Sequence, residues 1–414
     1  MAHLLCVGVD VALKQNRARF LDDTETDRGR LAFPNDAGGA VSLVAQTCRL
    51  LTRHQIPRVR FGLEATSFYG WHLALYLTKA PELEPFAPEV YLFNARTIDA
   101  YKKTYPDLPK TDWVDAYVLA DRVRIGRLPR PFAYDDRYLP LQRLTRHRYF
   151  LVKQLVRHKN YFLGYLFLKC SRLVQACPIS DPLGAAGREL VLAYPSAEDL
   201  AAASLDELAR FLVDKSRNKF YNPYDVAKAL QAAAKHSYRL PERLQDPVNR
   251  ILASTLQIIR DLEREIRQTS RAIEREMHGV PCPLLSIPGI GPVFGAGILA
   301  EIGDVFNFPD DDALAKFAGL TWREHASGEF EGEDKPLSRT GNPYLRYYLV
   351  EAANSVRRYA PEYQAYYERK FREATRHHHK RALVLTARKL VRLVYALLRT
   401  GRAYTGTRKE ACPA

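Results

Sequence analysis

Four acidic residues in the first third of the chain are candidates for one shared site. Asp10 lies within an apolar run that predicts a strand, and Asp is disfavoured inside strands and costly to bury without a partner. Glu64 ends a second apolar run, and Asp112 and Asp115 are spaced to share one face at the start of a predicted helix. Brought together, the four carboxylates would form a site of hard oxygen ligands that suits Mg²⁺, or Mn²⁺ in its place.

Each acid has a simpler explanation when it is considered alone. Asp112 also suits the first turn of a helix, where the helix dipole favours negative charge, and Glu64 suits an exposed strand end. The set of four favours the metal site, because two bound cations can stabilise both the attacking and the leaving oxygen of a phosphodiester. These residues therefore indicate phosphodiester chemistry.

Hydroxyl and basic residues gather in a second segment, over 317–346. Ser327 precedes Gly328, whose missing side chain leaves room for a nucleic-acid backbone, and Ser338 is the other serine of this segment. A serine is a weak nucleophile that needs a base or a metal. His325 is two residues from Ser327, a spacing that guarantees no contact in a loop, so a plain polar loop is the alternative.

A Pro-Gly-x-Gly turn precedes that segment. Gly289 and Gly291 would let backbone amides approach a phosphate with no side chain in the way, and Pro288 sets the turn. Such a turn is typical of a helix-hairpin-helix motif, and a simple turn between two helices is the alternative.

These residues must be positioned by strands and helices whose patterns follow one another along the chain. Apolar runs predict strands over 4–11, 17–21, 29–33, 59–64 and 90–94. Helices are predicted between the later strands, and one more starts near Thr111. Strands first, and then strands alternating with helices, favour an α/β layer fold for the N-terminal part. The remaining patterns are helical, and 414 residues are enough for two or three domains.

The distribution of charge indicates a polyanionic partner. The net charge is +15; residues 141–177 contain eight Lys or Arg and no acid, and residues 346–414 contain 16 Lys or Arg against five acids. Two such segments are typical of surfaces that contact nucleic-acid phosphates, and a basic protein that is merely soluble is the alternative. The cations expected to contact phosphates include Arg146, Arg157, Lys380 and Arg388.

Residues 244–278 carry apolar side chains at alternating steps of three and four, which is the pattern of a coiled coil. We expect self-association through this helix, with Ile259 and Ile266 in the seam. Packing of one long amphipathic helix onto its own domain is the alternative.

Other sequence features restrict the class of protein. The six cysteines are scattered without a CxxC pair, so neither a disulfide framework nor a zinc site is indicated. The first residues lead straight into a strand, and no apolar run is long enough to span a bilayer. A cytoplasmic protein with no membrane partner is therefore expected.

Asp10 in its strand, Glu64 in the sequence FGLEAT, and the sequence KTDWVDA over 110–116 together resemble the DEDD RuvC-like domain of one family of insertion-sequence transposases. That family includes the Piv-type site-specific invertases and the RNA-guided bridge recombinases. The resemblance resumes in the C-terminal part, where the segment 317–346 is similar to the signature of the family's transposase domain. That signature has a Gly-Leu, a basic residue, His-x-Ser-Gly and a later Ser-basic-x-Gly-Asn-x-x-Leu-Arg.

The resemblance implies a fold class and a domain organisation. The N-terminal domain would be α/β and RNase H-like, the connector helical with a coiled coil, and the C-terminal domain mostly α with a helix-hairpin-helix-like segment. The predicted parts are a RuvC-like DEDD domain over 1–135, a connector over 136–280 with an insert over 178–242 and a coiled coil over 244–278, a transposase domain over 281–402 and a flexible tail over 403–414.

The resemblance also implies roles for the residues. The four acids, Asp10, Glu64, Asp112 and Asp115, would bind Mg²⁺, and Ser327 would carry DNA covalently between strand breakage and rejoining. Nucleic-acid contacts would come from the glycine turn and from basic residues, namely Lys110, Gly289, Gly291, Arg323, Arg339 and Arg346. Arg339 stands where Lys is commoner in the family and Thr340 where a basic residue is usual, but Arg keeps the charge and can bind a phosphate.

The implied partners are target and donor DNA, a structured non-coding RNA encoded by the element, and further copies of the chain in a dimer or tetramer. Because DNA is an implied partner, a nucleoid-associated location within the cytoplasm is expected. Three other functions fit parts of the sequence. A RuvC-like nuclease would need the acids but not the serine, an actin-like ATPase would need Gly-rich phosphate loops that the sequence lacks, and in a non-catalytic nucleic-acid-binding protein the acids would be incidental.

Overall fold

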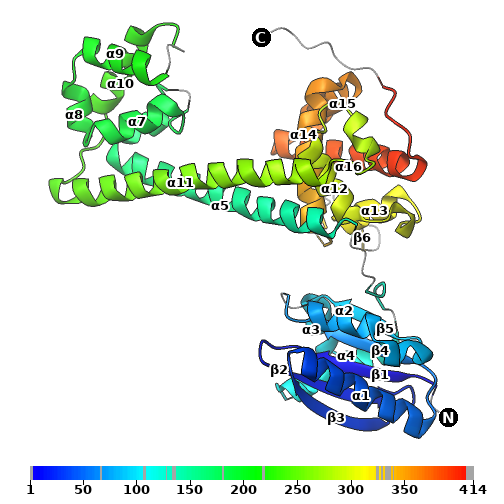
Figure 1. Cartoon of the computed structure of the whole chain (residues 1–414). Helices are drawn as coiled ribbons and strands as arrows, with labels where there is room; N and C mark the ends of the chain where they lie inside the picture. Colours follow the sequence, from blue (N-terminus) through cyan, green and yellow to red (C-terminus); the bar gives the residue numbers. More distant parts are fainter. Residues whose placement is uncertain are drawn as a thin grey trace. The chain divides into compact units, whose positions relative to one another are not determined.

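Contacts between residues divide the chain into two compact units, residues 1–135 and 136–414 (Figure 1). The computed structural model describes residues 3–65, 68–105, 109–126, 128–132, 137–179, 181–216, 220–322, 326–327, 330–331, 337–338 and 340–406. Only the main chain is described for residues 216, 326–327 and 330–331.

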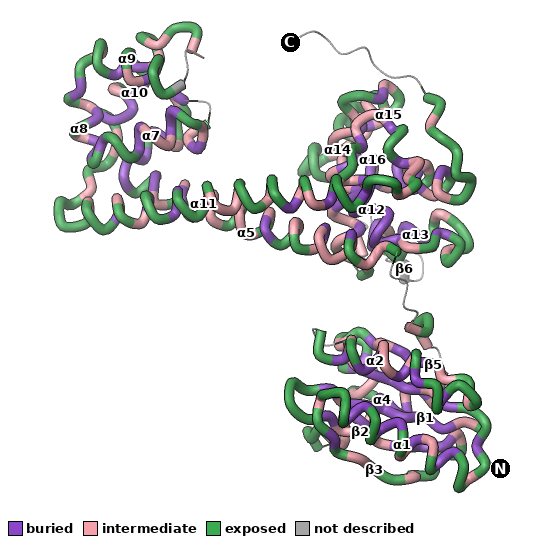
Figure 2. Tube along the Cα trace, viewed as in Figure 1, coloured by how far each residue is buried: buried purple, intermediate pink, exposed green. Residues whose placement is uncertain are grey.

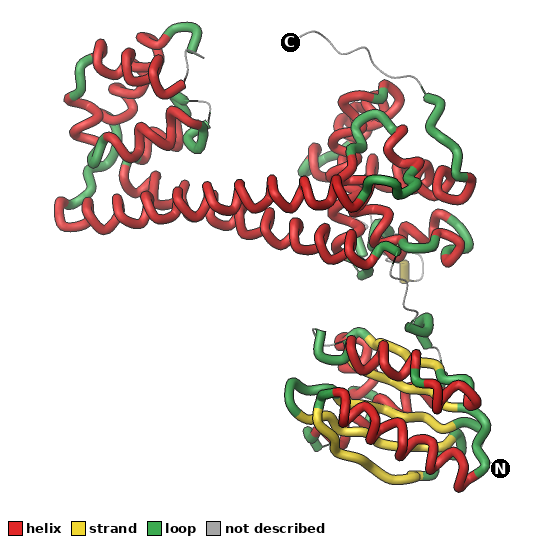
Figure 3. The backbone as a smooth tube through the Cα atoms, viewed as in Figure 1, coloured by secondary structure: helices red, strands yellow, loops and turns green. Residues whose placement is uncertain are grey.

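The first unit is built on a mixed sheet of five strands (Figure 3). The strands are β1 Leu5–Asp10, β2 Gln15–Asp22, β3 Asp27–Pro34, β4 Val59–Glu64 and β5 Glu89–Phe93. Their order in the sheet is β3-β2-β1-β4-β5; β2 is antiparallel to both of its neighbours, whereas β4 is parallel to both β1 and β5. This sheet confirms the predicted α/β layer fold, and an RNase H-like domain fits it.

Helices cover both faces of this sheet. They are α1 Ala37–His54, α2 Trp71–Lys79, the 3-10 helix η1 Pro81–Phe86, α3 Ala95–Lys102 and α4 Asp112–Ile125. Leucines of α1 and α2 pack with Val7, Val9 and Phe61 on one face, and α4 packs with Cys6 and Phe93 on the other. A Cβ on Gly8 would collide with the α4 backbone, so the glycine lets this helix lie close against β1.

Two long antiparallel helices, α5 Leu139–Lys169 and α11 Glu242–Glu276, run through the second unit (Figure 1). Apolar residues of α11, Ile259 among them, are buried in one core with Phe162 and Leu166 of α5, and Figure 2 shows buried positions along both helices. The apolar face predicted over 244–278 is therefore covered by the same chain, which agrees with the alternative that this helix packs onto its own domain. Ile266, the other residue expected in a seam between chains, is half-exposed. A long helix whose apolar stripe meets another helix gains this burial without a second subunit.

The other elements of the second unit pack near the ends of this pair. Near one end lie α6 Ser171–Ala176, α7 Ala185–Ala193, α8 Ala197–Ala202, α9 Leu205–Ser216 and α10 Pro223–Lys235. Near the other lie η2 Pro283–Ser286, α12 Pro292–Ile302, η3 Val305–Asn307, α13 Asp311–Ala318, β6 Ala326–Ser327, β7 Phe330–Glu331, α14 Pro343–Tyr359, α15 Pro361–Glu373 and α16 His378–Thr400. Among the described helices, none is both long and apolar enough to cross a membrane.

Candidate active site

The four acids predicted from the sequence come together at one edge of the first unit's sheet. Asp10 is the last residue of β1 and Glu64 the last residue of β4; the two strands are parallel neighbours, with Val9 paired to Leu63. Helix α4 begins at Asp112 and packs across β1, which places Asp112 and Asp115 in its first turn. Strand ends and a helix start thus hold carboxylates from three elements at one place.

The electrostatics of Asp10 show how close these carboxylates are. Burial, followed by the negative charges of Asp112, Asp115 and Glu64, raises the pKa of Asp10 from its usual 3.8 to about 6, and the positive charge of Arg17 acts in the opposite direction. Burial and nearby like charges both disfavour the ionised form of a carboxyl. The charge of Asp10 is therefore unfavourable in this place, and a bound cation would offset that cost.

The donor set suits Mg²⁺ in chemistry, because all four side chains offer hard oxygen ligands. The side chains do not yet stand in a ligand geometry: within the described residues, no group of three or more acidic, histidine or cysteine side chains is close enough to hold an ion. Lys102, at the end of α3, forms an ion pair with Asp115. An ammonium group thus provides part of the positive charge that a metal would provide.

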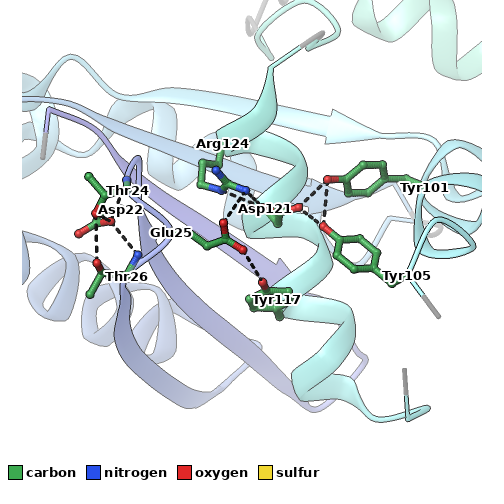
Figure 4. A network of polar contacts seen from close by, with 9 residues as sticks. All are labelled: Asp22, Thr24, Glu25, Thr26, Tyr101, Tyr105, Tyr117, Asp121 and Arg124. Atoms are coloured by element: carbon green, nitrogen blue, oxygen red, sulfur yellow. Dashed lines mark hydrogen bonds and ion pairs between the residues drawn. The ribbon is translucent and has the colours of Figure 1, made fainter. Parts of the chain in front are cut away.

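A buried network fixes α3, and with it Lys102, onto α4 (Figure 4). Asp121 of α4 accepts hydrogen bonds from Tyr101, at 2.5 Å, and from Tyr105, and it pairs with Arg124 at 2.6 Å. Burial opposes ionisation of Asp121, but the hydrogen bonds from these three residues hold its pKa below the usual value. Because Tyr101 precedes Lys102, the network sets the ammonium group beside the acid cluster.

Two asparagines that the sequence did not indicate join the loops behind the acids. The side chain of the buried Asn16 accepts from the Ala12 amide at 3.1 Å and donates to Asn35 at 3.2 Å. Asn35 in turn donates to the carbonyl oxygens of Ala12, at 2.9 Å, and Tyr69, at 3.2 Å. The chain after Asp10 is therefore tied to the chain after Glu64. The sequence signal that could have indicated this contact is Asn16, a polar residue at a buried position of β2.

Lys110 is exposed two residues before α4, and Thr111 caps that helix by accepting from the Val114 amide. The lysine therefore precedes the helix turn that bears Asp112 and Asp115 and remains available to a ligand. Its role in binding nucleic acid stays a prediction.

The second candidate segment places Ser327 in a short hairpin. Strand β6 pairs with β7, with Ser327 opposite Phe330, and the Ser327 side chain lies outside the described residues. Arg323, His325 and Arg339 also lie outside them. Ser338 donates its amide to the Thr321 carbonyl at 2.8 Å, and the two hydroxyls are 3.1 Å apart.

The Gly-Asn-x-x-Leu-Arg part of the segment, residues 341–346, stabilises the packing of three helices. Asn342 caps α14 through the Tyr344 and Leu345 amides and donates to Glu301 at 2.7 Å. Arg346 donates to the Ala318 carbonyl at 3.2 Å, at the end of α13. These contacts fix the start of α14 against α12 and α13, on either side of the segment that carries Ser327.

The contacts of Glu301 contradict one prediction made from the basic segments, namely that Arg146 contacts a phosphate. Arg146 binds it through two hydrogen bonds of 2.7 and 2.9 Å, and the Glu301 side chain is fully buried. Arg146 therefore joins α5 to α12 and is not free for a phosphate. Arg388 is likewise paired with Asp311, at 3.0 Å, and with Asp312, whereas Arg157 and Lys380 are exposed. Several cations in these segments are structural because an acid from another element faces them.

The glycine turn differs from a regular pair of helices, because a 3-10 helix, η2, precedes it. Gly289 has a φ of 98°, and a Cβ there would lie 2.9 Å from the Val356 nitrogen of α14, so packing explains this glycine. Gly291 is the N-cap of α12, and a Cβ there would meet nothing within 4 Å. Open space at a helix start is where a phosphate could approach.

Comparison with known proteins identifies the family. A model of the transposase IS116/IS110/IS902 family matches residues 283–368, and a transposase model for the DEDD domain of IS110 elements matches residues 7–168. The 42 kDa protein of insertion element IS900 from Mycobacterium paratuberculosis is 32% identical over 414 residues, which cover 98% of each chain.

The chain belongs to the IS116/IS110/IS902 family of transposases.

Other relatives support this membership. The 44.8 kDa protein of insertion element IS116 from Streptomyces clavuligerus is 30% identical over 321 residues, 75% of this chain and 76% of its own. The pilin gene-inverting protein of Moraxella bovis is 32% identical over 123 residues, 29% of this chain and 37% of its own. As a member of the IS116/IS110/IS902 family, the protein is a transposase, an enzyme of DNA recombination.

Proposed function

We propose that this transposase breaks and rejoins DNA by transesterification, with the acid cluster of the first unit and Ser327 of the second acting in one reaction. The observation that carries the proposal is the convergence of four carboxylates in a chain of a transposase family, where burial and then the charges of the other three acids raise the pKa of Asp10 to about 6. Asp22 and Asp121, elsewhere in the unit, are partnered by hydroxyl and arginine donors. A carboxyl whose pKa is raised beside three other acids suits a charged ligand.

Asp10, Glu64, Asp112 and Asp115 would hold Mg²⁺ or Mn²⁺. When bound, the cation supplies Lewis-acid stabilisation of the charge that develops on phosphodiester oxygens. Asp10 and Glu64 sit at strand ends and Asp112 and Asp115 in a capped helix turn, so the chain fixes their backbones before any ligand binds. Asn16 and Asn35 hold the loops that follow Asp10 and Glu64. Lys102 would keep Asp115 in place until a cation takes the place of its ammonium group.

Ser327 would be the nucleophile. Its Oγ would form a bond to the phosphorus of one DNA strand while the bond from that phosphorus to a deoxyribose oxygen breaks and the hydroxyl proton passes to a base. Attack by a deoxyribose hydroxyl would then displace the serine and rejoin DNA, so the phosphodiester energy is conserved and no ATP is needed. The hairpin of β6 and β7 positions the Ser327 backbone, and the contacts of Asn342 and Arg346 support its surroundings.

Nucleic-acid contacts would come from the exposed cations Lys110, Arg157 and Lys380, from the open turn at Gly291, and from Gly289, Arg323, Arg339 and Arg346. We further propose a structured RNA from the element as a partner and a dimer or tetramer as the working assembly. The inverting relative makes inversion an alternative outcome of the same strand exchange.

The test is to trap protein–DNA adducts on a nicked substrate bearing the element ends and to resolve them on a denaturing gel. We expect adducts with the wild type and with Ser338→Ala at reduced yield, none with Ser327→Ala, and a loss above about 100-fold with Asp10→Asn. The acid variant keeps the shape of the side chain, so DNA binding is its control.

Two outcomes would contradict the proposal in different ways. Adducts that persist in Ser327→Ala but vanish in Ser338→Ala would move the nucleophile to Ser338. A wild type that recombines DNA without any adduct would reject the serine step and leave a nuclease-like reaction at the acids. Normal activity of Asp10→Asn would reject the metal site.

A further inference from the structure

Arginines on β2 and on the edge strand β3, beside the acid cluster, divide into two kinds. Arg19 pairs with Asp27 and Arg28 with Asp22, each at 2.6 Å. Within the described part of the chain, no carboxylate lies at ion-pair distance from Arg17 on β2 or from the neighbouring Arg30 on β3. Among the described residues, these two arginines therefore form no ion pair, although the charge of Arg17 acts on Asp10 from a longer distance.

Both of these arginines stack on one indole. The guanidinium carbon of Arg17 lies 5.2 Å from the centre of the Trp113 ring and that of Arg30 lies 5.0 Å from it. Stacking occupies the flat face of a guanidinium and leaves the N–H donors around its rim available. Only one bond, from Arg17 to the Asn16 carbonyl at 3.4 Å, is made by these donors to described residues. Arg30 is exposed and Arg17 and Trp113 are half-exposed, so a ligand can reach the donors.

The stack lies directly beside the acids. Arg17 is the cross-strand partner of Asp10, and paired residues of neighbouring strands point to the same face of a sheet. Trp113 follows Asp112 in the first turn of α4. The acids therefore lie next to the stack on the side of β1, and Arg30 extends the positive charge outward across β2 to β3.

A strand of DNA that places one phosphate at four carboxylates must also place the neighbouring phosphates close by, and those are repelled by the same acids. Cations next to the cluster offset that repulsion, and an arginine can bind a phosphate with two parallel hydrogen bonds. The indole fixes the two guanidinium groups in advance, which lowers the entropy that binding costs.

We propose that Arg17 and Arg30, stacked on Trp113, bind phosphates of the DNA strand adjacent to the phosphodiester that reacts at the acid cluster. The inference rests on the proposed function of that cluster. The stack is a positioning element: it sets which phosphodiester reaches the acids, and it takes no part in bond exchange. The alternative is that the stack only packs α4 against β2 and β3.

The test uses the full chain with Arg17→Gln, Arg30→Gln and the double variant, and Arg19→Gln as the matched control. Arg19 lies on the same strand and stacks on Tyr117 at 5.7 Å, but Asp27 neutralises it. Binding of a fluorescein-labelled duplex with the element end is measured without divalent cations at several salt concentrations. The slope of log K against log salt should fall by about one for each of Arg17 and Arg30, with affinity reduced about tenfold in the double variant.

A second measurement locates the contact. Neutral methylphosphonates are placed one at a time on either side of the reacting phosphodiester. One of them should weaken binding of the wild type and of Arg19→Gln, yet have no further effect on the double variant, because both changes remove the same contact.

The inference fails if the double variant keeps the slope of the wild type, or if every methylphosphonate weakens it as much as the wild type. A lower melting temperature with an unchanged slope would assign the stack to packing alone. Failure of the proposed function is seen separately, as normal recombination by Asp10→Asn.

Discussion

Asp10 and Glu301 are both shielded acids, one in each unit, and their surroundings are opposite. Glu301 accepts two hydrogen bonds from Arg146 and one from Asn342, and its side chain is fully buried. Asp10 faces Asp112, Asp115 and Glu64, and its pKa rises to about 6. The first arrangement pairs its acid with a cation, whereas the second places its acid among other acids.

The difference explains why motif residues of the two units have different roles. In the C-terminal signature the Asn342 and Arg346 side chains satisfy backbone and carboxylate groups, so they maintain the fold around Ser327. In the N-terminal unit burial and the neighbouring acids disfavour the ionised form of Asp10. A carboxyl with a perturbed pKa beside other acids is the better sign of a ligand site.

The largest effect on stability is expected from breaking the buried ion pair between Glu301 and Arg146. Glu301→Gln should lower the free energy of unfolding by about 2–4 kcal/mol, because Arg146 would keep a charge in a largely buried place without its counter-ion. Arg157→Gln is the control, since Arg157 is exposed on the same helix. Denaturant unfolding of both variants measures the difference, and an equal, small effect would show that the buried pair is not important for stability.

Removing the charge of Asp10 should change the free energy of unfolding in the opposite direction. Asp10→Asn should raise the free energy of unfolding in EDTA by about 1–2 kcal/mol near pH 7.5, because it removes one member of the repelling cluster. The folded pKa, about 6, lies above the ordinary 3.8, so the destabilisation by Asp10 is complete above about pH 7.

The same shift predicts a pH dependence. As pH falls from 7 to 4, the wild type should gain stability relative to Asp10→Asn, because its carboxyl becomes protonated in the folded state first. Chemical denaturation at pH 4, 5.5 and 7.5 compares the two proteins. If Asp10→Asn is less stable than the wild type at pH 7.5, the cluster does not contain the repulsion described here.

The smallest effect separates a free cation from a paired one on α16. Lys380→Gln should reduce the salt slope of DNA binding by about one, whereas Arg388→Gln should leave it unchanged, since Asp311 and Asp312 already neutralise Arg388. Fluorescence anisotropy across a salt series measures both slopes. Equal reductions would mean that DNA displaces the two acids from Arg388.

Local patterns were enough to predict the sheet and its acids. Short apolar runs placed all five strands; β1 and β4 are buried along almost their whole length, and a strand covered on both faces carries a nearly continuous apolar run. Asp10 was a candidate because an acid is unusual inside a strand, and the acids at the end of β4 and in the first turn of α4 were candidates because the four together suit a metal. Parallel pairing of β1 with β4 then brings Asp10 to Glu64.

The tertiary structure alone decided which groups face one another. The apolar stripe of α11 is the same whether it meets a second chain or α5, and only the fold covers Ile259 with Phe162 and Leu166. Likewise the sequence distinguishes neither Arg146 from Arg157 nor Arg17 from Arg19, because a charge becomes structural when a distant acid is folded against it. Trp113 meets both Arg17 and Arg30 through the packing of α4 on the sheet, a contact between residues about 80 to 100 positions apart that no local pattern encodes.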